Sequence, residues 1–115
     1  ITPIKGLGIS NVVRGPVANW GRTLAVELGS FGITVNNVLP GFTDTARLRS
    51  LFDGKANRSG TTPEAIRATA ISAIPAARIG TADEIAGAVQ FLASPAGSYC
   101  NGLNLPVDGG RVCQA

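Results

Sequence analysis

Two short apolar runs, one near the middle of the chain and one near its end, constrain the fold most. Residues 33–39 are rich in β-branched side chains and end at Pro40–Gly41, which is typical of a buried strand followed by a turn. Residues 103–107 predict a second short strand, closed by a turn at 108–110. Because helical segments separate the runs, we expect a right-handed crossover that pairs the strands in parallel. The sequence therefore predicts an α/β fold with the order helix, strand, helices, strand.

Apolar residues spaced along one helix face predict a long first helix. It is expected to begin near Ser10 and to end at Gly29 or Gly32, because glycine supplies the left-handed conformation that ends a helix. Pro16 fits poorly in a helix interior and indicates a kink or a later start. The residues of the predicted apolar face are Ile9, Val13, Trp20, Leu24 and Leu28.

The segment after the first strand predicts two shorter helices. One is expected over 45–52, and the polar, glycine-containing residues 53–62 are interpreted as a mobile loop. Thr62 is the predicted N-cap of the next helix, with Pro63 at its first position and its end at about Ala73.

A stronger helix is predicted to start after Thr81 and to end at 94–97. Its first turn carries acidic side chains, which the positive end of the helix dipole favours. The acidic residues are Asp83 and Glu84, and the predicted buried stripe is Ile85, Val89 and Leu92.

Composition limits the function classes. The chain has 115 residues, enough for one domain, and its 44% apolar and 15% charged residues exclude a disordered chain. The net charge of +3 comes from scattered basic residues rather than a concentrated patch, so we expect no nucleic-acid partner. No apolar run reaches the roughly 18 residues of a membrane span, so no membrane partner is expected. Two strands make a poor sheet and leave apolar faces uncovered, which predicts an oligomer.

The two cysteines and the absence of histidine bear on metals and location. Cys100 and Cys113 have no metal-ligand spacing, and without histidine the usual zinc sites lack ligands, so no metal site is predicted. Free thiols in a reducing cytoplasm are expected rather than a disulfide. The chain opens on Ile1 instead of Met, which indicates a fragment or a processed product.

Several blocks, in this order, resemble the short-chain dehydrogenase/reductase family. The run 32–41 resembles the strand and Pro-Gly turn that follow the active-site helix of that family. Residues 78–80, 84–92 and 98–110, which include Val107-Asp108-Gly109-Gly110, resemble its C-terminal signature. The resemblance covers the chain from about Ile9 to Gly110 and looks closest to the 3-oxoacyl carrier-protein reductase-like branch.

The resemblance implies that residues 1–115 are the C-terminal portion of a single domain. That portion belongs to a doubly wound, Rossmann-like parallel sheet. The N-terminal half, with the Gly-rich turn that receives the pyrophosphate, is absent from this chain. The implied activity is hydride transfer between NAD or NADP and a carbonyl or alcohol substrate, with cofactor bound only when the missing half is present. The residue that reads the ribose 2′ position lies in that half, so the sequence does not select between NAD and NADP.

The turn after the first strand is the candidate cofactor site. Ligands of such folds bind beyond the carboxyl ends of the strands, where Pro40 and Gly41 lie. The resemblance implies that Thr43 bonds the nicotinamide amide through its backbone and that the Thr45 hydroxyl lies near the amide or the phosphates. The alternative is an ordinary strand-ending turn with Thr45 as a helix N-cap.

The resemblance departs from the family pattern at the active-site helix. The family's Tyr-x-x-x-Lys pair is replaced here by Ser10 and Arg14. Arg14 can hold a ribose and keeps a permanent positive charge. Ser10 is shorter than Tyr, and its hydroxyl has no evident base to activate it. The alternative is that both residues are polar positions near a helix start.

Two readings of the function stay open. The first is part of an NAD(P)-dependent oxidoreductase, with residues 47–73 as a substrate lid and Trp20 at an oligomer interface or buried within one chain. Its expected partners are a small carbonyl or alcohol substrate and a second copy or a complementing N-terminal half. The second is a non-catalytic binding or scaffold protein derived from such an enzyme. Tyr99 is expected to pack beside the last strand.

Overall fold

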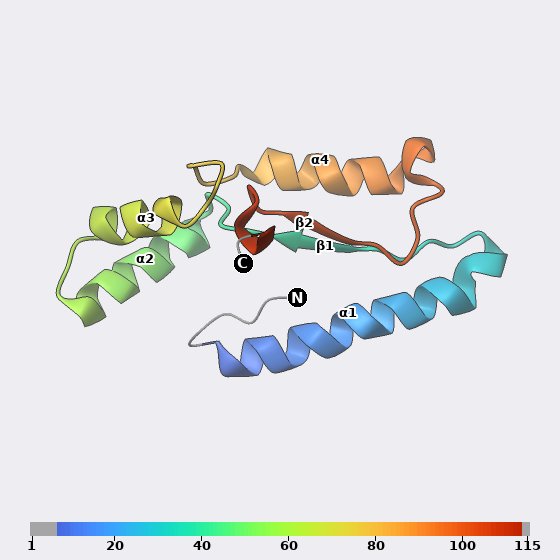
Figure 1. The fold of residues 1–115 in the computed structure, drawn as a ribbon, viewed down its shortest axis with the longest axis horizontal. Coiled ribbons are helices and arrows are strands. Elements are labelled where there is room, and N and C mark those ends of the chain that lie inside the picture. The colour runs from blue at the N-terminus through green and yellow to red at the C-terminus, as the bar shows by residue number, and fades with distance from the viewer. Residues whose placement is uncertain (1–6, 114–115) are drawn as a thin grey trace. The chain divides into compact units, whose positions relative to one another are not determined.

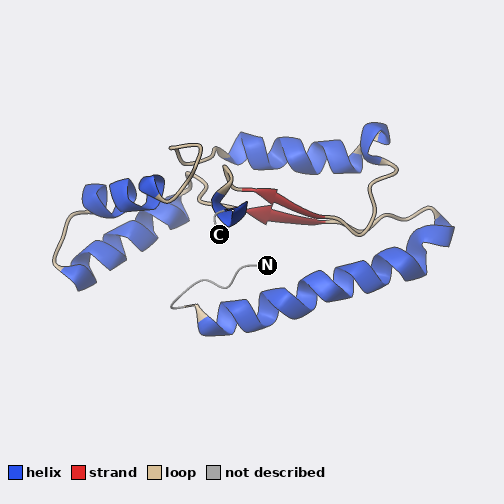
Figure 2. Cartoon of the chain, viewed as in Figure 1, coloured by secondary structure: helices blue, strands red, loops and turns tan. Residues whose placement is uncertain are grey.

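The computed structural model describes residues 7–113 and places two strands among the helices (Figures 1 and 2). The strands β1 and β2 form a two-stranded sheet and run in the same direction. Hydrogen bonds from Asn37 N to Leu103 O (2.8 Å) and from Gly41 N to Val107 O (2.9 Å) set one constant register. The predicted α/β fold with a parallel crossover is therefore confirmed. The elements are α1 (Gly8–Leu28), η1 (Gly29–Phe31), β1 (Asn37–Pro40), α2 (Ala46–Ser59), α3 (Pro63–Ser72), α4 (Ala82–Ala93), η2 (Pro95–Gly97), β2 (Asn104–Val107) and η3 (Arg111–Cys113).

Contacts within the chain group it into two compact units. The first unit contains residues 7–39 and 88–105, and the second contains residues 40–87 and 106–113. Cys100 in the first unit and Cys113 in the second are both free thiols, as predicted. Across residues 7–113, no helix has both the length and the apolar character that crossing a bilayer requires.

In the first unit, α1 buries its small residues and exposes its large ones. Ala18, Gly21 and Ala25 are the buried positions, whereas the predicted apolar face is largely exposed, with Trp20 at 63% and Ile9 at 86%. The buried face of α1 needs small residues, because a Cβ on Gly21 would lie 2.9 Å from Asn37 Nδ2. Burial of Trp20 within one chain, one of its two predicted roles, is therefore wrong for the described residues, and its role at an oligomer interface stays a prediction.

The ends of α1 follow the prediction in part. Pro16 lies inside the helix, so the helix does not begin there. Gly29 stays right-handed and continues into η1, and Gly32, at φ 73°, supplies the left-handed end.

Hydrogen bonds to asparagine side chains interrupt the ladder where the first half of β1 was expected. The strand begins at Asn37 rather than at residue 33. Just before it, Asn36 Oδ1 accepts from Leu103 N (3.0 Å), and Asn101 Oδ1 accepts from Val35 N (2.9 Å). These amides take positions that a regular ladder gives to backbone carbonyls, which is why residues 33–36 are extended but not a strand.

In the second unit, α2 has 14 residues and extends seven residues beyond its predicted end at residue 52. The expected loop at 53–62 is wrong, because the helix continues to Ser59 and ends at Gly60, φ 65°. Its buried face explains the extension: Leu48, Phe52 and Ala56 recur every fourth residue and lie inward.

The next helix, α3, matches its prediction and packs along α2 (Figure 1). Thr62 Oγ1 accepts from Ala65 N at 3.2 Å, and Pro63 is the first helical residue. The core of this unit forms where these helices meet the segments beside them. It consists of Leu48, Phe52 and Ile79, with Phe42, Ile66, Ala70 and Ile71 packed against them.

The helix α4 begins as predicted, after Thr81. Its stripe is only partly covered, because Ile85 and Leu92 are half-buried and Val89 is 49% exposed. Tyr99 is fully exposed, so the prediction that it packs beside the last strand is wrong for the described chain.

Ala77 is the one non-glycine residue with positive φ, at 54°, among the described residues 7–113. This conformation costs a residue with a Cβ about 1–2 kcal/mol. We therefore expect Ala77→Gly to raise the free energy of unfolding by about 1 kcal/mol in urea denaturation. The matched control is Ala86→Gly at an exposed position of α4, expected to lower it by about 1 kcal/mol. Equal losses in both variants would contradict the prediction.

Candidate cofactor-binding turn

The turn after β1 is held against the turn after β2 by a close backbone approach. Gly41 N donates to Val107 O at 2.9 Å, which extends the strand pairing by one residue. A Cβ on Gly41 would lie 2.6 Å from Asp108 Cα, so no larger residue fits without movement. Gly41 is therefore required for packing within the protein, and the cofactor approach that the sequence suggested there stays a prediction.

Thr43 is fixed by a parallel bridge to Gly80. Gly80 N donates to Phe42 O at 2.9 Å, and Asp44 N donates to Gly80 O at 2.8 Å. Because peptide groups of an extended chain point to alternating sides, the N–H and C=O of Thr43 itself point away from Gly80. Within residues 7–113 these two groups form no hydrogen bond to another backbone group. The Thr43 hydroxyl donates to Gly41 O at 3.2 Å.

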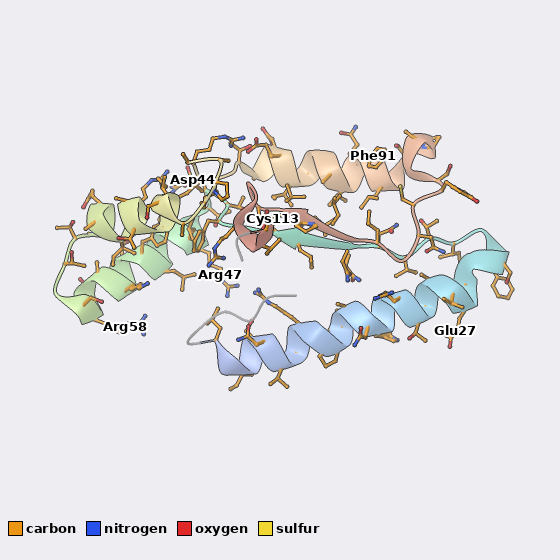
Figure 3. The ribbon with its side chains drawn as sticks, viewed as in Figure 1. Glu27, Asp44, Arg47, Arg58, Phe91 and Cys113 are labelled. Atoms are coloured by element: carbon orange, nitrogen blue, oxygen red, sulfur yellow. The ribbon has the colours of Figure 1, made fainter. Side chains whose placement is uncertain are left out.

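Thr45 caps α2. Its Oγ1 accepts from Leu48 N at 3.2 Å, which confirms the predicted N-cap alternative. The hydroxyl proton is not used by that bond, so the cap leaves Thr45 able to donate to a ligand. Pro40 is exposed at the end of β1. Asp44 precedes Thr45 and Arg47 follows it at the start of α2, and both are labelled in Figure 3.

Phe42 anchors the turn to the core of the second unit. Its ring meets Phe52 edge-on, with centroids 6.0 Å apart. The Arg111 guanidinium lies over the same ring, 4.4 Å from its centroid. Sequence reasoning did not single out Phe42 or Arg111; the only local signal was the Asp-Gly-Gly turn that precedes Arg111.

A small cavity of about 80 Å³ lies beside the turn in the second unit. Two of its charged lining residues pair with each other, because Arg78 Nη2 and Nη1 donate to Glu84 Oε1 (2.6 Å) and Oε2 (2.9 Å). Glu84 Oε2 also accepts from Thr81 N at 2.8 Å. Two hydrogen bonds lower the pKa of Glu84 from 4.5 to about 2, and the bond from Arg78 has a larger effect than the bond from Thr81.

Ser10 and Arg14 lie one helical turn apart on α1. Ser10 is half-buried and Arg14 is exposed. Both belong to the first unit, whereas Pro40, Gly41 and the two threonines belong to the second. The structure brings the four turn residues together, and the roles of Ser10 and Arg14 stay predictions.

Comparison with known proteins shows the family to which the chain belongs. Residues 3–111 match a protein family described as Enoyl-(Acyl carrier protein) reductase. The 3-oxoacyl-[acyl-carrier-protein] reductase MabA of Mycobacterium avium is 42% identical over 116 residues, covering 96% of this chain and 41% of that protein. The chain belongs to the short-chain dehydrogenase/reductase family. It matches the C-terminal part of that family's fold and is similar to its 3-oxoacyl carrier-protein reductases.

Solved structures of short-chain dehydrogenases superpose on most of the chain. A family member from Francisella tularensis has a TM-score of 0.87 at 33% identity, covering 90% of this chain and 43% of that one. A putative 2-deoxy-D-gluconate 3-dehydrogenase from Agrobacterium tumefaciens, with bound NADP, has a TM-score of 0.73 at 35% identity, covering 90% and 39%. The chain therefore spans about two fifths of the length of the relatives it matches.

Substitution of Gly41 tests the close approach to Asp108. We expect Gly41→Ala to lower the free energy of unfolding by about 1–3 kcal/mol, because its methyl group overlaps the Asp108 backbone. Gly54→Ala is the matched control: nothing lies within 4 Å of its new Cβ, and the helix gains about 0.5–1 kcal/mol. Urea unfolding measures both variants. An unchanged midpoint for Gly41→Ala would show that the turns are not in contact.

The Arg78–Glu84 pair predicts a pH dependence. Because the pKa of Glu84 is lowered from 4.5 to about 2, its contribution to stability is complete above pH 4.5 and is lost as pH falls through 2. Both side chains are substantially exposed, so the effect on unfolding is small. Carboxyl ¹³C NMR titration should give a Glu84 midpoint near 2, rising toward 4.5 in Arg78→Gln. An identical midpoint in both proteins would rule out the pairing.

Proposed function

We propose that this chain forms the nicotinamide-side part of an NAD(P)-dependent oxidoreductase. The reaction is hydride transfer between the cofactor and a carbonyl or alcohol substrate, and the bound nicotinamide supplies or accepts the hydride. The observation that carries the proposal is the orientation of the Thr43 peptide. Its N–H and C=O point away from Gly80 and form no hydrogen bond to another backbone group within residues 7–113. A primary carboxamide, which has a donor and an acceptor side by side, is complementary to that pair.

The other residues of the turn fit the same ligand. Gly41 fixes the turn at the end of β1, because Asp108 occupies the space in which a side chain would lie. Thr45 keeps its hydroxyl proton available while it caps α2, and can donate to the carboxamide or to a phosphate oxygen. Together these groups orient a nicotinamide and contribute little else to the reaction.

Ser10 and Arg14 take the remaining roles in this proposal. Arg14 is exposed and holds the ribose hydroxyls with a permanent charge. Ser10 stands where the family has its proton-transferring Tyr, and an alcohol lacks the accessible pKa that suits a phenol to that step. We therefore expect proton transfer in this protein to be slow.

The missing part of the family fold decides when the cofactor binds. The chain spans about two fifths of its relatives, and the Gly-rich turn for the pyrophosphate has no counterpart in its sequence. Binding of NAD or NADP accordingly requires an N-terminal half, and NADP is favoured because it is bound in a structure 35% identical to this chain. The hairpin of α2 and α3 then covers the substrate as a lid, and α1 supplies an oligomer surface.

A non-catalytic binding or scaffold role is the second candidate. Ser10 at the Tyr position favours it, because the chain then lacks the family's proton donor. The two candidates differ in whether the assembled protein oxidises NADPH.

The test is titration of the ¹⁵N-labelled chain with NADPH and NADH. Alone, the 115 residues should show no measurable binding by calorimetry. Mixed with a separately produced N-terminal half of the Mycobacterium avium reductase, they should bind NADPH and shift the Thr43 amide resonance. Gly54→Ala, far along α2, should bind as the parent does. Cofactor binding that leaves the Thr43 amide unmoved would refute the proposed role of the turn.

The double variant Ser10→Tyr, Arg14→Lys distinguishes the two candidates. If the protein is an enzyme limited by its proton donor, the assembled variant should oxidise NADPH with a carbonyl substrate faster than the parent. If it is a scaffold, neither protein should bind or oxidise NADPH.

A further inference from the structure

Arg111 is the one arginine that stacks on an aromatic ring within residues 7–113. Its guanidinium carbon lies 4.4 Å from the centroid of Phe42, and the residue is half-buried. Phe42 is itself held by Phe52, with ring centroids 6.0 Å apart. The cation is therefore fixed against a rigid surface rather than free in solvent.

The loop that carries Arg111 is also fixed. Asp108 Oδ1 accepts from Gly110 N (3.0 Å) and its Oδ2 accepts from Val112 N (2.9 Å). The carboxylate thus binds the backbone on both sides of Arg111. Asp108 in turn lies against Gly41, so this loop packs directly against the candidate cofactor turn.

The hydrogen-bond donors of Arg111 are unused in the described structure. A guanidinium has five N–H donors in a planar fork. Elsewhere in residues 7–113, Arg49, Arg67 and Arg78 pair with carboxylates, whereas Arg111 has no carboxylate within 4.0 Å. Stacking leaves the edge of the fork open, and that edge matches the two oxygens of an oxyanion.

We propose that Arg111 is an oxyanion-binding site beside the candidate cofactor turn, and that it selects substrates bearing a carboxylate or a phosphate. That the bound anion belongs to a substrate rests on the proposed function. The prior fixation of the guanidinium reduces the entropy lost on binding, which distinguishes this arginine from flexible surface arginines. Phe42 adjoins Thr43, so a bound oxyanion lies next to the residue that orients the nicotinamide.

Anion titration of the ¹⁵N-labelled 115-residue chain tests the site. Inorganic phosphate and acetate are the two probes, and acetamide is the neutral control. The Arg111 Nε–H resonance should shift and saturate with one or both anions and stay unmoved with acetamide. The tighter probe identifies the substrate group as phosphate or carboxylate.

Arg111→Lys removes the planar fork and keeps the charge. We expect this substitution to weaken anion binding by about tenfold or more. Binding is measured from the backbone amide shifts of residues 108–112. Phe42→Leu removes the stacking surface and should weaken binding too, with retained Asp44 and Gly80 amide protection showing that the turn is still folded. Arg22→Lys is the matched control, an exposed arginine on α1 with no role in the proposed site, and it should change nothing.

Two outcomes would overturn the proposal. One is an equal, unsaturated shift of Arg22 and Arg111, which indicates charge screening alone. The other is unchanged anion binding in Arg111→Lys. Neither depends on the cofactor: NADPH binding is detected at the Thr43 amide and anion binding at Arg111, so failure of one leaves the other standing.

Discussion

The close approach of Gly41 to Asp108 is the contact on which the candidate site depends. It joins the ends of two parallel strands that are far apart in the sequence, at a point where a Cβ would lie 2.6 Å from a backbone atom. On one side of this contact the chain enters the Thr43–Gly80 bridge and the cap of α2. On the other side Asp108 closes the loop that aims Arg111 at Phe42. One glycine therefore brings a peptide donor, a peptide acceptor and a cation into the same compact unit.

Local signals predicted most of the element order, because each signal acts within a few residues. Thr62 and Pro63 start α3, and the β-branched run ending at Pro40–Gly41 contains β1. The failures occurred where distant residues decide. Residues 53–59 look like a polar loop, yet they are helical because Ala56 completes a buried face begun at Leu48. Residues 33–36 look like a strand, but side-chain amides of Asn36 and Asn101 interrupt the ladder.

The candidate site shows the same division. The resemblance selected Gly41, Thr43 and Thr45. The Pro-Gly turn alone predicts that these residues lie together after the strand. The orientation of the Thr43 peptide could not be predicted in this way, because it is set by Gly80, which is brought alongside only when α2 and α3 fold back. Arg111 was missed for a similar reason. Its partner Phe42 is distant in the sequence, and an arginine after a glycine turn has no distinguishing pattern.

The distribution of apolar surface distinguishes the two units. The second unit has a core in which Leu48, Phe52 and Ile79 are each at most 8% exposed. The first unit buries only Ala18 and Ala25 among its apolar side chains, and α1 leaves Trp20 63% exposed. Exposed apolar area of this kind is unfavourable in water, so α1 gains most from a covering surface. The unit containing Ser10 and Arg14 thus depends on such a surface more than the unit containing the cofactor turn, which has a buried core of its own.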